Sequence, residues 1–260
     1  MTKNSKQASK VLTLDHYHNH KLVEVYDTVN PIAADTRFYT NLVQELNPNK
    51  VVDVGCGTGL LTSQLTANNR EIIGIEPAKL MLDQAKKNYA HLNISWIQGT
   101  TSDVKTQCKN TDLVIMTGHV SQVFITEKAW SQVLQDVHRF LKPQARLVFE
   151  MRNPQVKPWS AWNKSQSSRT LKDPVHGTIE TYVQTLTIDI QNNIVDYLGV
   201  CHVEGQKIQY KDQLKFRNLK QLQDSLQAEG FQIEKVYGYW DKSQFQPSQS
   251  PEIIVEAIKK

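Results

Sequence analysis

The chain has 260 residues, of which 39% are hydrophobic and 22% are charged, as in a globular protein of one large domain or one domain with an insertion. Its net charge of +4 is only mildly basic, and no apolar run is long enough to cross a bilayer. Three cysteines without a CxxC pair or a His/Cys cluster argue against disulfides and structural zinc. We therefore expect a cytoplasmic protein without a metal, whose oligomeric state the sequence leaves open.

The N-terminal residues 1–14 are polar and lysine-bearing, and they lack the apolar stretch of a secretory signal. We expect them to form a disordered tail. Residues 15–46 are expected to be helical, and Pro48 ends this run.

From residue 51 onward, short apolar strands alternate with helical patterns. The expected strands are residues 51–54, 72–75, 94–98, 112–116 and 146–151. Helical spacing separates them, as in Leu61 and Leu65, and Pro77 suits the first turn of the next helix. Strands that alternate with helices imply βαβ crossovers and a doubly wound, mostly parallel sheet. Their near-continuous apolar character agrees with such a sheet, which is covered on both faces.

The composition and the hydrophobic pattern of the sequence change after Met151. Residues 152–172 are rich in proline, tryptophan and basic side chains, and residues 178–217 alternate with a period of two. Turns are expected at 191–193 and 204–206, which gives three antiparallel strands in an inserted lid. A helix ended by Gly230 and closing strands at 231–239 and 252–258 complete the chain.

These patterns predict an α/β fold with a seven-stranded, Rossmann-like sheet and an inserted antiparallel strand lid. Residues 15–151 and 218–260 are expected to form the main domain, and residues 152–217 the lid and substrate region.

A glycine-rich turn, Gly55-Cys56-Gly57-Thr58-Gly59, follows the first strand. Glycines there let the backbone approach a ligand, and ligands bind beyond the carboxyl ends of such strands. Glu76 ends the second strand about 20 residues after Gly57, where an acid can accept ribose hydroxyls. The spacing is GxGxG, with Leu60 where the dinucleotide fingerprint GxGxxG has its last glycine. The spacing therefore favours a nucleoside without a pyrophosphate.

The segment VVDVGCGTG, followed by GIEP and AKLMLDQAK, resembles motif I and the following acidic motif of class I S-adenosylmethionine-dependent methyltransferases. The resemblance is clear over residues 50–150 and implies S-adenosylmethionine as the cofactor. It places Gly55, Cys56 and Gly57 at the methionine and ribose parts, Glu76 at the ribose, Pro77 and Met81 beside the adenine, and Gly99, Thr100 and Thr101 at the adenine edge. Many relatives have aspartate at the position of Thr100, and Asp103 lies further along.

Segments 116–124 (MTGHVSQVF) and 149–154 (FEMRNP) resemble bacterial, small-molecule-type members of that class. The further candidates for cofactor contact are Asp53, Thr58, Gly59, Thr117, Gly118, His119, Gln122 and Tyr26.

Residues after the fourth and fifth expected strands are candidates to bind the methyl acceptor or to take a proton from it. His119 is the candidate general base, or else a hydrogen-bonding histidine without a proton role. Arg152 and Asn153 are candidates to bind an acceptor carboxylate or phosphate, or else belong to loop structure and capping. Trp159 and Trp162 either cover an acceptor pocket or form a small core under the lid.

Three functions remain open from the sequence. A methyltransferase acting on a small molecule is favoured, because an inserted lid encloses a compact acceptor. A methyltransferase acting on tRNA or another nucleic acid is the alternative that the basic, tryptophan-bearing loop suggests. A non-catalytic S-adenosylmethionine-binding protein is the third, since no DPPY-type amine-methylating motif is present.

Overall fold

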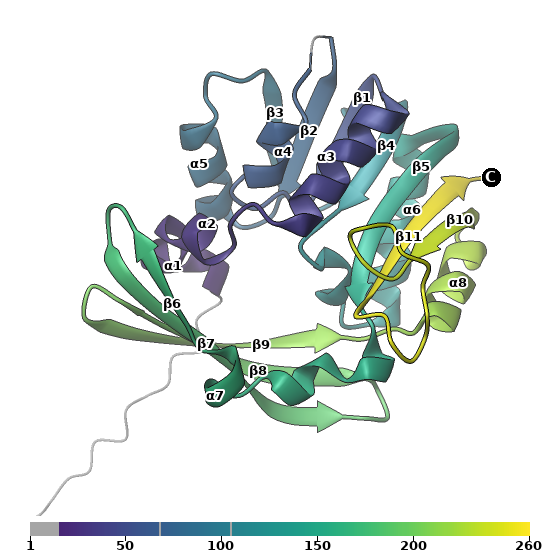
Figure 1. Ribbon diagram of the computed structural model, residues 1–260. Coiled ribbons are helices and arrows are strands. Elements are labelled where there is room, and N and C mark those ends of the chain that lie inside the picture. The colour runs from purple at the N-terminus through teal and green to yellow at the C-terminus, as the bar shows by residue number, and fades with distance from the viewer. Residues whose placement is uncertain (1–15, 68, 105) are drawn as a thin grey trace, which may run out of the picture.

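The computed structural model describes residues 16–67, 69–104 and 106–260, so the expected N-terminal tail lies outside the described residues. A central sheet flanked by helices forms one part of the molecule, and a second, antiparallel sheet lies below it (Figure 1).

The central sheet has seven strands in the order β10-β11-β5-β4-β1-β2-β3. Their bounds are Lys50–Val54 (β1), Glu71–Glu76 (β2), Ile94–Gln98 (β3), Thr111–Met116 (β4), Leu141–Arg152 (β5), Phe231–Tyr237 (β10) and Glu252–Lys259 (β11). The five strands from β1 to β5 pair in parallel, whereas β11 pairs antiparallel with both β5 and β10. The predicted seven-stranded, mostly parallel sheet is therefore confirmed. The strand order reverses at β1, between β2 and β4, where open sheets of this kind bind ligands.

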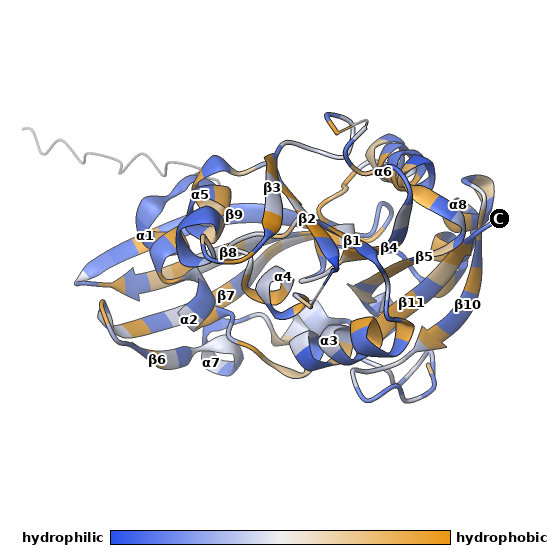
Figure 2. Ribbon diagram, turned by 90° about the horizontal axis from the view of Figure 1, so that it is seen from above, coloured by the Kyte–Doolittle hydropathy of each residue, from blue (hydrophilic) through white to orange (hydrophobic). Residues whose placement is uncertain are grey.

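Helices cover both faces of this sheet. They are α3 (Ala34–Leu46), α4 (Leu60–Gln64), α5 (Lys79–Asn88), α6 (Glu127–Phe140) and α8 (Leu219–Ala228). Side chains of α3 and α4 pack on one face with Val51, and side chains of α6 and α8 pack on the other with Val52. Neighbouring residues of a strand thus enter opposite cores, which explains the continuous apolar runs and the hydrophobic strands in Figure 2. Among the described residues, no helix combines the length and apolar character that a bilayer crossing requires.

The N-terminal helical region is broken, which corrects the prediction of a continuous run. It contains η1 (His16–His18), α1 (His20–Glu24), α2 (Tyr26–Val29) and then α3. Pro31 separates α2 from α3, since proline cannot donate the backbone hydrogen bond of a helix interior. Pro77 likewise lies just before α5, whose N-cap is Ala78, and not inside its first turn.

The second sheet has four antiparallel strands, not the three that the sequence predicted. They are β6 (Arg169–Asp173), β7 (Gly177–Asp189), β8 (Ile194–Val203) and β9 (Gln206–Lys215). The turns at 191–193 and 204–206 lie between β7, β8 and β9 as expected. Before β6 the chain forms only short helical turns, which are η3 (Pro154–Val156), η4 (Pro158–Ala161) and α7 (Lys164–Ser167). We call the sheet β6–β9 the lid.

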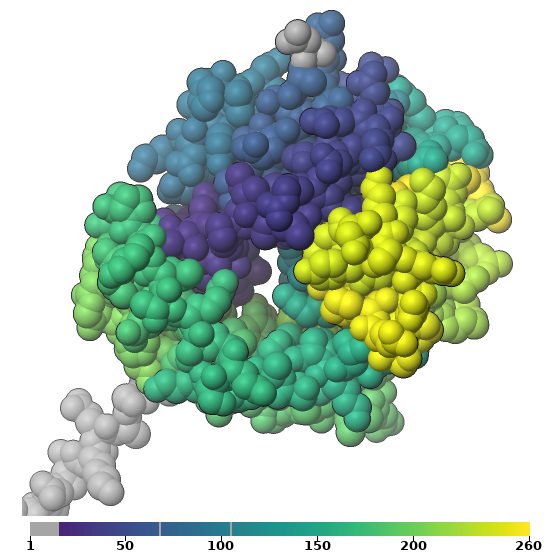
Figure 3. Space-filling model, in the orientation of Figure 1, coloured from purple at the N-terminus to yellow at the C-terminus, as the bar shows by residue number. Residues whose placement is uncertain are grey.

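The N-terminal helices lie between the lid and the central sheet (Figure 1). Leu22 and Val25 pack against Ile179 and Cys201 of the lid. Thr28 Oγ1 donates to the carboxylate of Asp173 in the lid at 2.5 Å. The helices α1 and α2 therefore pack with the lid, and we call α1, α2 and the lid together the roof. Figure 3 shows a hollow where this roof meets the rest of the molecule.

Candidate functional site

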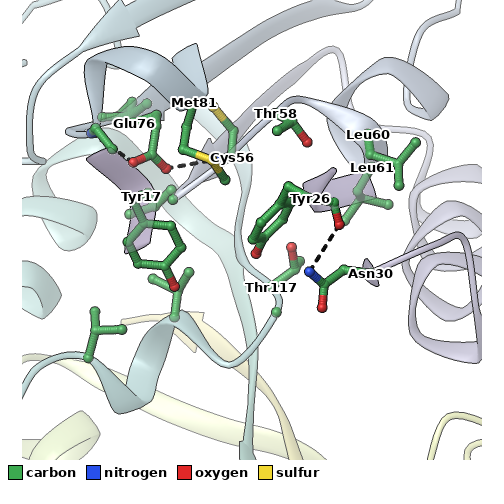
Figure 4. Close-up of a pocket in the computed structure, with 18 of the residues that line it drawn as sticks. Tyr17, Tyr26, Asn30, Cys56, Thr58, Leu60, Leu61, Glu76, Met81 and Thr117 are labelled. Atoms are coloured by element: carbon green, nitrogen blue, oxygen red, sulfur yellow. Dashed lines mark hydrogen bonds between the residues drawn. The ribbon is translucent and has the colours of Figure 1, made fainter. Parts of the chain in front are cut away.

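A cavity of about 600 Å³ lies at the carboxyl ends of the central parallel strands. Figure 4 shows side chains from the glycine turn, from the end of β2 and from the N-terminal helices around it. The cavity brings together most of the predicted cofactor residues. These are Tyr26, Gly55, Cys56, Gly57, Thr58, Glu76, Pro77, Met81, Gly99, Thr100, Thr101, Thr117 and Gly118.

The glycine turn needs its glycines for conformation and for space. Gly55, Gly57 and Gly59 all have positive φ, which L residues with a Cβ rarely adopt. A Cβ on Gly55 would lie 2.5 Å from Val120, and one on Gly57 would meet only the Met81 methyl at 3.3 Å. The backbone of Gly57 is therefore bare towards the cavity that it lines.

The carboxylate of Glu76 is held by two backbone N–H groups, one from the glycine turn and one from the residue before α5. Its Oε2 accepts the Gly57 N–H at 3.0 Å, and its Oε1 accepts the Ala78 N–H at 2.8 Å. These bonds fix the orientation of the carboxylate. Burial and the nearby Glu76 raise the pKa of the Tyr26 phenol, so that this hydroxyl stays protonated.

The adenine edge predicted at Gly99–Thr101 includes a carboxylate that is already engaged. Asp103 Oδ2 accepts both the Thr100 N–H and the Thr100 hydroxyl at 2.8 Å. Thr101 Oγ1 donates to Asp136 of α6 at 2.9 Å. Asp103 thus holds the turn after β3, and Thr100 lines the cavity.

Four predicted cofactor residues do not line this cavity. His119 lines a neighbouring cavity, which is described below. Asp53 is buried behind the glycine turn, where its Oδ2 accepts from Thr62 Oγ1 at 2.6 Å and burial raises its pKa to about 7. Gly59 begins α4 in a left-handed conformation and lies against Trp96. Gln122 is fully buried, and its side chain links Arg152 of β5 to the backbone of Lys215 in β9.

A second cavity, of about 490 Å³, lies between the sheet edge and the lid. It shares part of its wall with the first cavity, so the two adjoin. The shared residues are Tyr17, Tyr26, Val29, Asn30, Gly118, Val123 and Arg169. Of the predicted acceptor and catalytic residues, His119, Arg152 and Trp162 line the second cavity.

Asn153 and Trp159 lie outside both cavities. Asn153 donates through Nδ2 to the carbonyls of Pro247 and Ser250, at 2.8 and 2.7 Å, so the capping and loop alternative describes it. Trp159 packs edge-on against Phe216, with ring centroids 4.7 Å apart, in a small core under the lid.

His119 is oriented by two glutamates. Its backbone N–H donates to Glu150 Oε1 at 2.6 Å, and its ring Nε2 lies 3.0 Å from Glu252 Oε2. Burial, and then the positive charge of Arg152, lower the pKa of His119 below its usual value, while Glu252 opposes this shift. The imidazole is therefore neutral at pH 7.

Sequence reasoning missed several residues of this region. Glu150 and Glu252 come from neighbouring strands of the central sheet, and the lid contributes Tyr182, Tyr197 and Tyr210 to the second cavity. A glutamate inside an apolar strand, as in Glu150, is the one signal that was present, because buried acids are rare without a partner. Burial raises the pKa of Glu150 to about 8.

Comparison with known proteins agrees with this arrangement. Residues 51–144 match a family model described as a methyltransferase domain. The chain is 31% identical over 107 residues to an uncharacterized methyltransferase of Oceanobacillus iheyensis, which covers 41% of this chain and 48% of the relative. The chain spans about half the length of this relative.

Solved structures extend the likeness to nearly the whole chain. The CcbJ methyltransferase of Streptomyces caelestis superposes with a TM-score of 0.76 at 15% identity, over 95% of this chain and 99% of that one. An amino pentose methyltransferase from Micromonospora echinaspora, solved with bound S-adenosylmethionine, gives 0.67 at 13% identity, over 91% and 97%. At these identities the likeness concerns the fold, lid included.

The fold is the Rossmann-like fold of class I methyltransferases, and the glycine turn lies at its switch point. Residues 51–144 of the chain match a methyltransferase domain.

Proposed function

We propose that the protein transfers a methyl group from S-adenosylmethionine to a small-molecule acceptor. The observation that carries this proposal is the pair of adjoining cavities. One lies against the glycine turn and Glu76, the other lies under the lid, and Gly118 lines both. A donor and an acceptor in these cavities would meet at the shared wall, and placing two reactants together supplies much of a transfer enzyme's acceleration.

The residues present fit the cofactor. A volume of about 600 Å³ suits a nucleoside with an amino-acid tail. The Glu76 carboxylate is oriented to accept ribose hydroxyls, and Pro77 and Met81 offer apolar surface for the adenine. The bare backbone at Gly57 leaves room that any Cβ would fill. When bound, the cofactor supplies a methyl group activated on a sulfonium.

The chain's own residues bind, orient and exclude water. Tyr17 and Tyr26 lie in the wall shared by the cavities, and Thr58 of the glycine turn is hydrogen-bonded to Asp27 of α2. This bond joins the roof to the cofactor side of the site. Closure of this kind keeps water from the reacting groups.

His119 is the proposed proton acceptor. Because Glu252 engages Nε2, the other ring nitrogen, Nδ1, is left to take a proton from an acceptor in the second cavity. Its lowered pKa keeps the imidazole in the base form at neutral pH. An acceptor that is already an unprotonated amine needs no such step.

Calorimetry with S-adenosylmethionine tests the cofactor site. A Gly57→Arg variant is expected to lose at least about 100-fold in affinity, because the side chain fills the cavity. Gly177→Arg is the matched control, since Gly177 at the start of β7 also has a positive φ (+76) and a Cβ there would meet nothing within 4 Å. Equal affinity of Gly57→Arg and wild type would refute this site.

Incubation with labelled cofactor, in separate metabolite and tRNA pools, tests the acceptor class. We expect label in a small metabolite, identified by mass. Label in tRNA alone would replace the proposal with a nucleic-acid methyltransferase. Tight cofactor binding without transfer to either pool would favour the non-catalytic alternative.

A further inference from the structure

The second cavity is lined by a guanidinium that has no carboxylate of the described residues at ion-pair distance. Arg152, at the end of β5, lines this cavity and not the first one. Among the residues that the structure describes, it makes no ion pair, and its one hydrogen bond runs from Nη1 to Gln122 Oε1 at 2.9 Å. Burial lowers the pKa of Arg152, but a guanidinium keeps its charge at any physiological pH.

Two carboxylates lie near this guanidinium without forming an ion pair with it. Glu252 lies opposite Arg152 in the β5–β11 register and its charge acts on Arg152, but its Oε2 hydrogen-bonds at 3.0 Å with the ring Nε2 of the neutral His119. Asp212, on the lid side of the cavity, lies 3.4 Å from His16 Nδ1. Arg169 adds a second cation to the cavity wall. The cavity is therefore poorer in negative than in positive charge.

The guanidinium is also held in a fixed position. Gln122 accepts from Arg152 and donates through Nε2 to the carbonyl of Lys215 in β9 at 3.3 Å. Arg152 lies over the ring of Trp162, 5.8 Å from its centroid, and Trp162 in turn contacts Tyr197 edge-on at 5.6 Å. A fixed, planar donor beside an aromatic ring is suited to an oxyanion with two oxygens in one plane.

We propose that the methyl acceptor is a compact anion, and that Arg152 binds its carboxylate or phosphate group. This inference rests on the proposed function and specifies its substrate class. The anion is bound on the lid side, away from the first cavity, while the nucleophilic atom lies at the wall shared near Gly118. Trp162 and Tyr197 cover the apolar part of the acceptor, and Gln122 is a positioning residue for Arg152.

Probes of one shape and different charge test this inference. Tryptophan fluorescence is titrated with benzoate, phenyl phosphate, benzyl alcohol and benzylamine, in the presence of S-adenosylhomocysteine. We expect saturable binding of at least one anion, at least about 10-fold tighter than the alcohol and the amine. The two anions distinguish a carboxylate from a phosphate site. Equal binding of all four probes, or no saturable binding of either anion, would overturn the proposal.

Variants assign the binding to Arg152. Arg152→Gln is expected to weaken binding of the preferred anion by about 10- to 100-fold. Arg152→Lys should weaken it less, because lysine keeps the positive charge but lacks the two parallel N–H donors of a guanidinium. Gln122→Glu keeps Arg152 but places a carboxylate beside it, so we expect a similar loss. Arg37→Gln, on the exposed side of α3, is the control and should bind normally.

Calorimetry with S-adenosylhomocysteine on the same variants separates the two proposals. Unchanged cofactor affinity shows that each variant is folded. If wild type fails to bind the cofactor, the proposed function fails. If it binds the cofactor but Arg152→Gln binds the anions as wild type does, only the anionic acceptor is refuted.

Discussion

At the residue scale, the site depends on side chains whose charge state the fold sets. Glu76 is fixed by two backbone N–H groups, and His119 is kept neutral by burial and by Arg152. Both are at the carboxyl edge of the sheet, but they face different cavities. Each therefore has a separate experimental signature.

Replacing Glu76 tests the ribose contact. We expect Glu76→Gln to weaken S-adenosylmethionine binding by about 10- to 100-fold, because hydrogen bonds to a charged group contribute about 1.5–3 kcal/mol. Calorimetry measures this loss. Glu71→Gln, at the exposed start of the same strand, serves as the control and should bind normally. An unaltered affinity for Glu76→Gln would rule out a ribose contact at this carboxylate.

The pH profile tests His119. A general base acts in its unprotonated form. Because the pKa of His119 is lowered, the residue stays unprotonated to lower pH. We therefore expect kcat to fall only below about pH 6.5. His119→Ala should lose about 10²- to 10⁴-fold in kcat and lose this acidic limb. His91→Ala, at an exposed histidine, is the control. A His119→Ala enzyme with the wild-type profile would leave the residue without a proton role.

Most of the residues predicted to bind the cofactor line one cavity, and the central ones lie close together along the chain. The glycine turn and Glu76 belong to one strand–helix–strand unit. Because its two strands pair side by side, the spacing along the sequence is enough to predict that the turn and the carboxylate lie close together. Gln122 lies outside the cavity in which it was predicted, and of the two alternatives for Asn153 the spacing along the chain did not select loop structure and capping. Their partners Lys215 and Ser250 are 93 and 97 residues away along the chain, and only the folded sheet and lid bring them together.

At the scale of elements, the lid shows where local patterns fail. Strand β6 contains a single large apolar residue, Leu171, and so has little alternation. Its extended form comes from pairing with β7, a contact that periodicity cannot report. The parallel strands, by contrast, are buried on both faces and were predicted from their own composition.

Gly199 in β8 offers a test of the lid's inner surface. It pairs with Tyr210 of β9, whose ring lies 2.0 Å from where a Cβ on Gly199 would be. Gly199→Val should therefore displace a ring that lines the second cavity, and we expect about a 10-fold higher KM for the acceptor, as overpacking typically costs about 1–3 kcal/mol. Steady-state kinetics measures this effect.

The cofactor site provides the internal comparison for this variant. S-adenosylmethionine affinity should change less than about twofold, since the first cavity has no lining residue from β8. Gly205→Asn is the control within the same sheet, because asparagine tolerates the left-handed turn that Gly205 adopts. A KM for Gly199→Val equal to that of the control would contradict the role of this ring.

At the scale of the whole molecule, buried acids make stability depend on pH. The folded-state pKa is raised to about 7 for Asp53 and to about 8 for Glu150, in both cases chiefly by burial. Between the unfolded and folded pKa values the folded chain binds more protons. The free energy of unfolding therefore falls as the pH rises from about 4 through about 8.

Urea unfolding at about pH 5 and about pH 8 measures this dependence. We expect wild type to be less stable at the higher pH, and Asp53→Asn to lose less stability between the two by at least about 1 kcal/mol, since one pKa unit corresponds to about 1.4 kcal/mol. Asp241→Asn, in an exposed loop, should follow wild type. Parallel behaviour of Asp53→Asn and wild type would show that Asp53 ionises in the native state without cost.

The two adjoining cavities share the N-terminal helices but differ in the stretches of the chain that form the rest of their walls. Of the residues that line the lid-side cavity, only Gly118, His119 and Val123 fall inside the family-matching segment 51–144. The remainder belong to the N-terminal helices and to residues 152–214. We therefore predict that substitutions within the segment 152–217 alter binding of the proposed acceptor more than binding of S-adenosylmethionine.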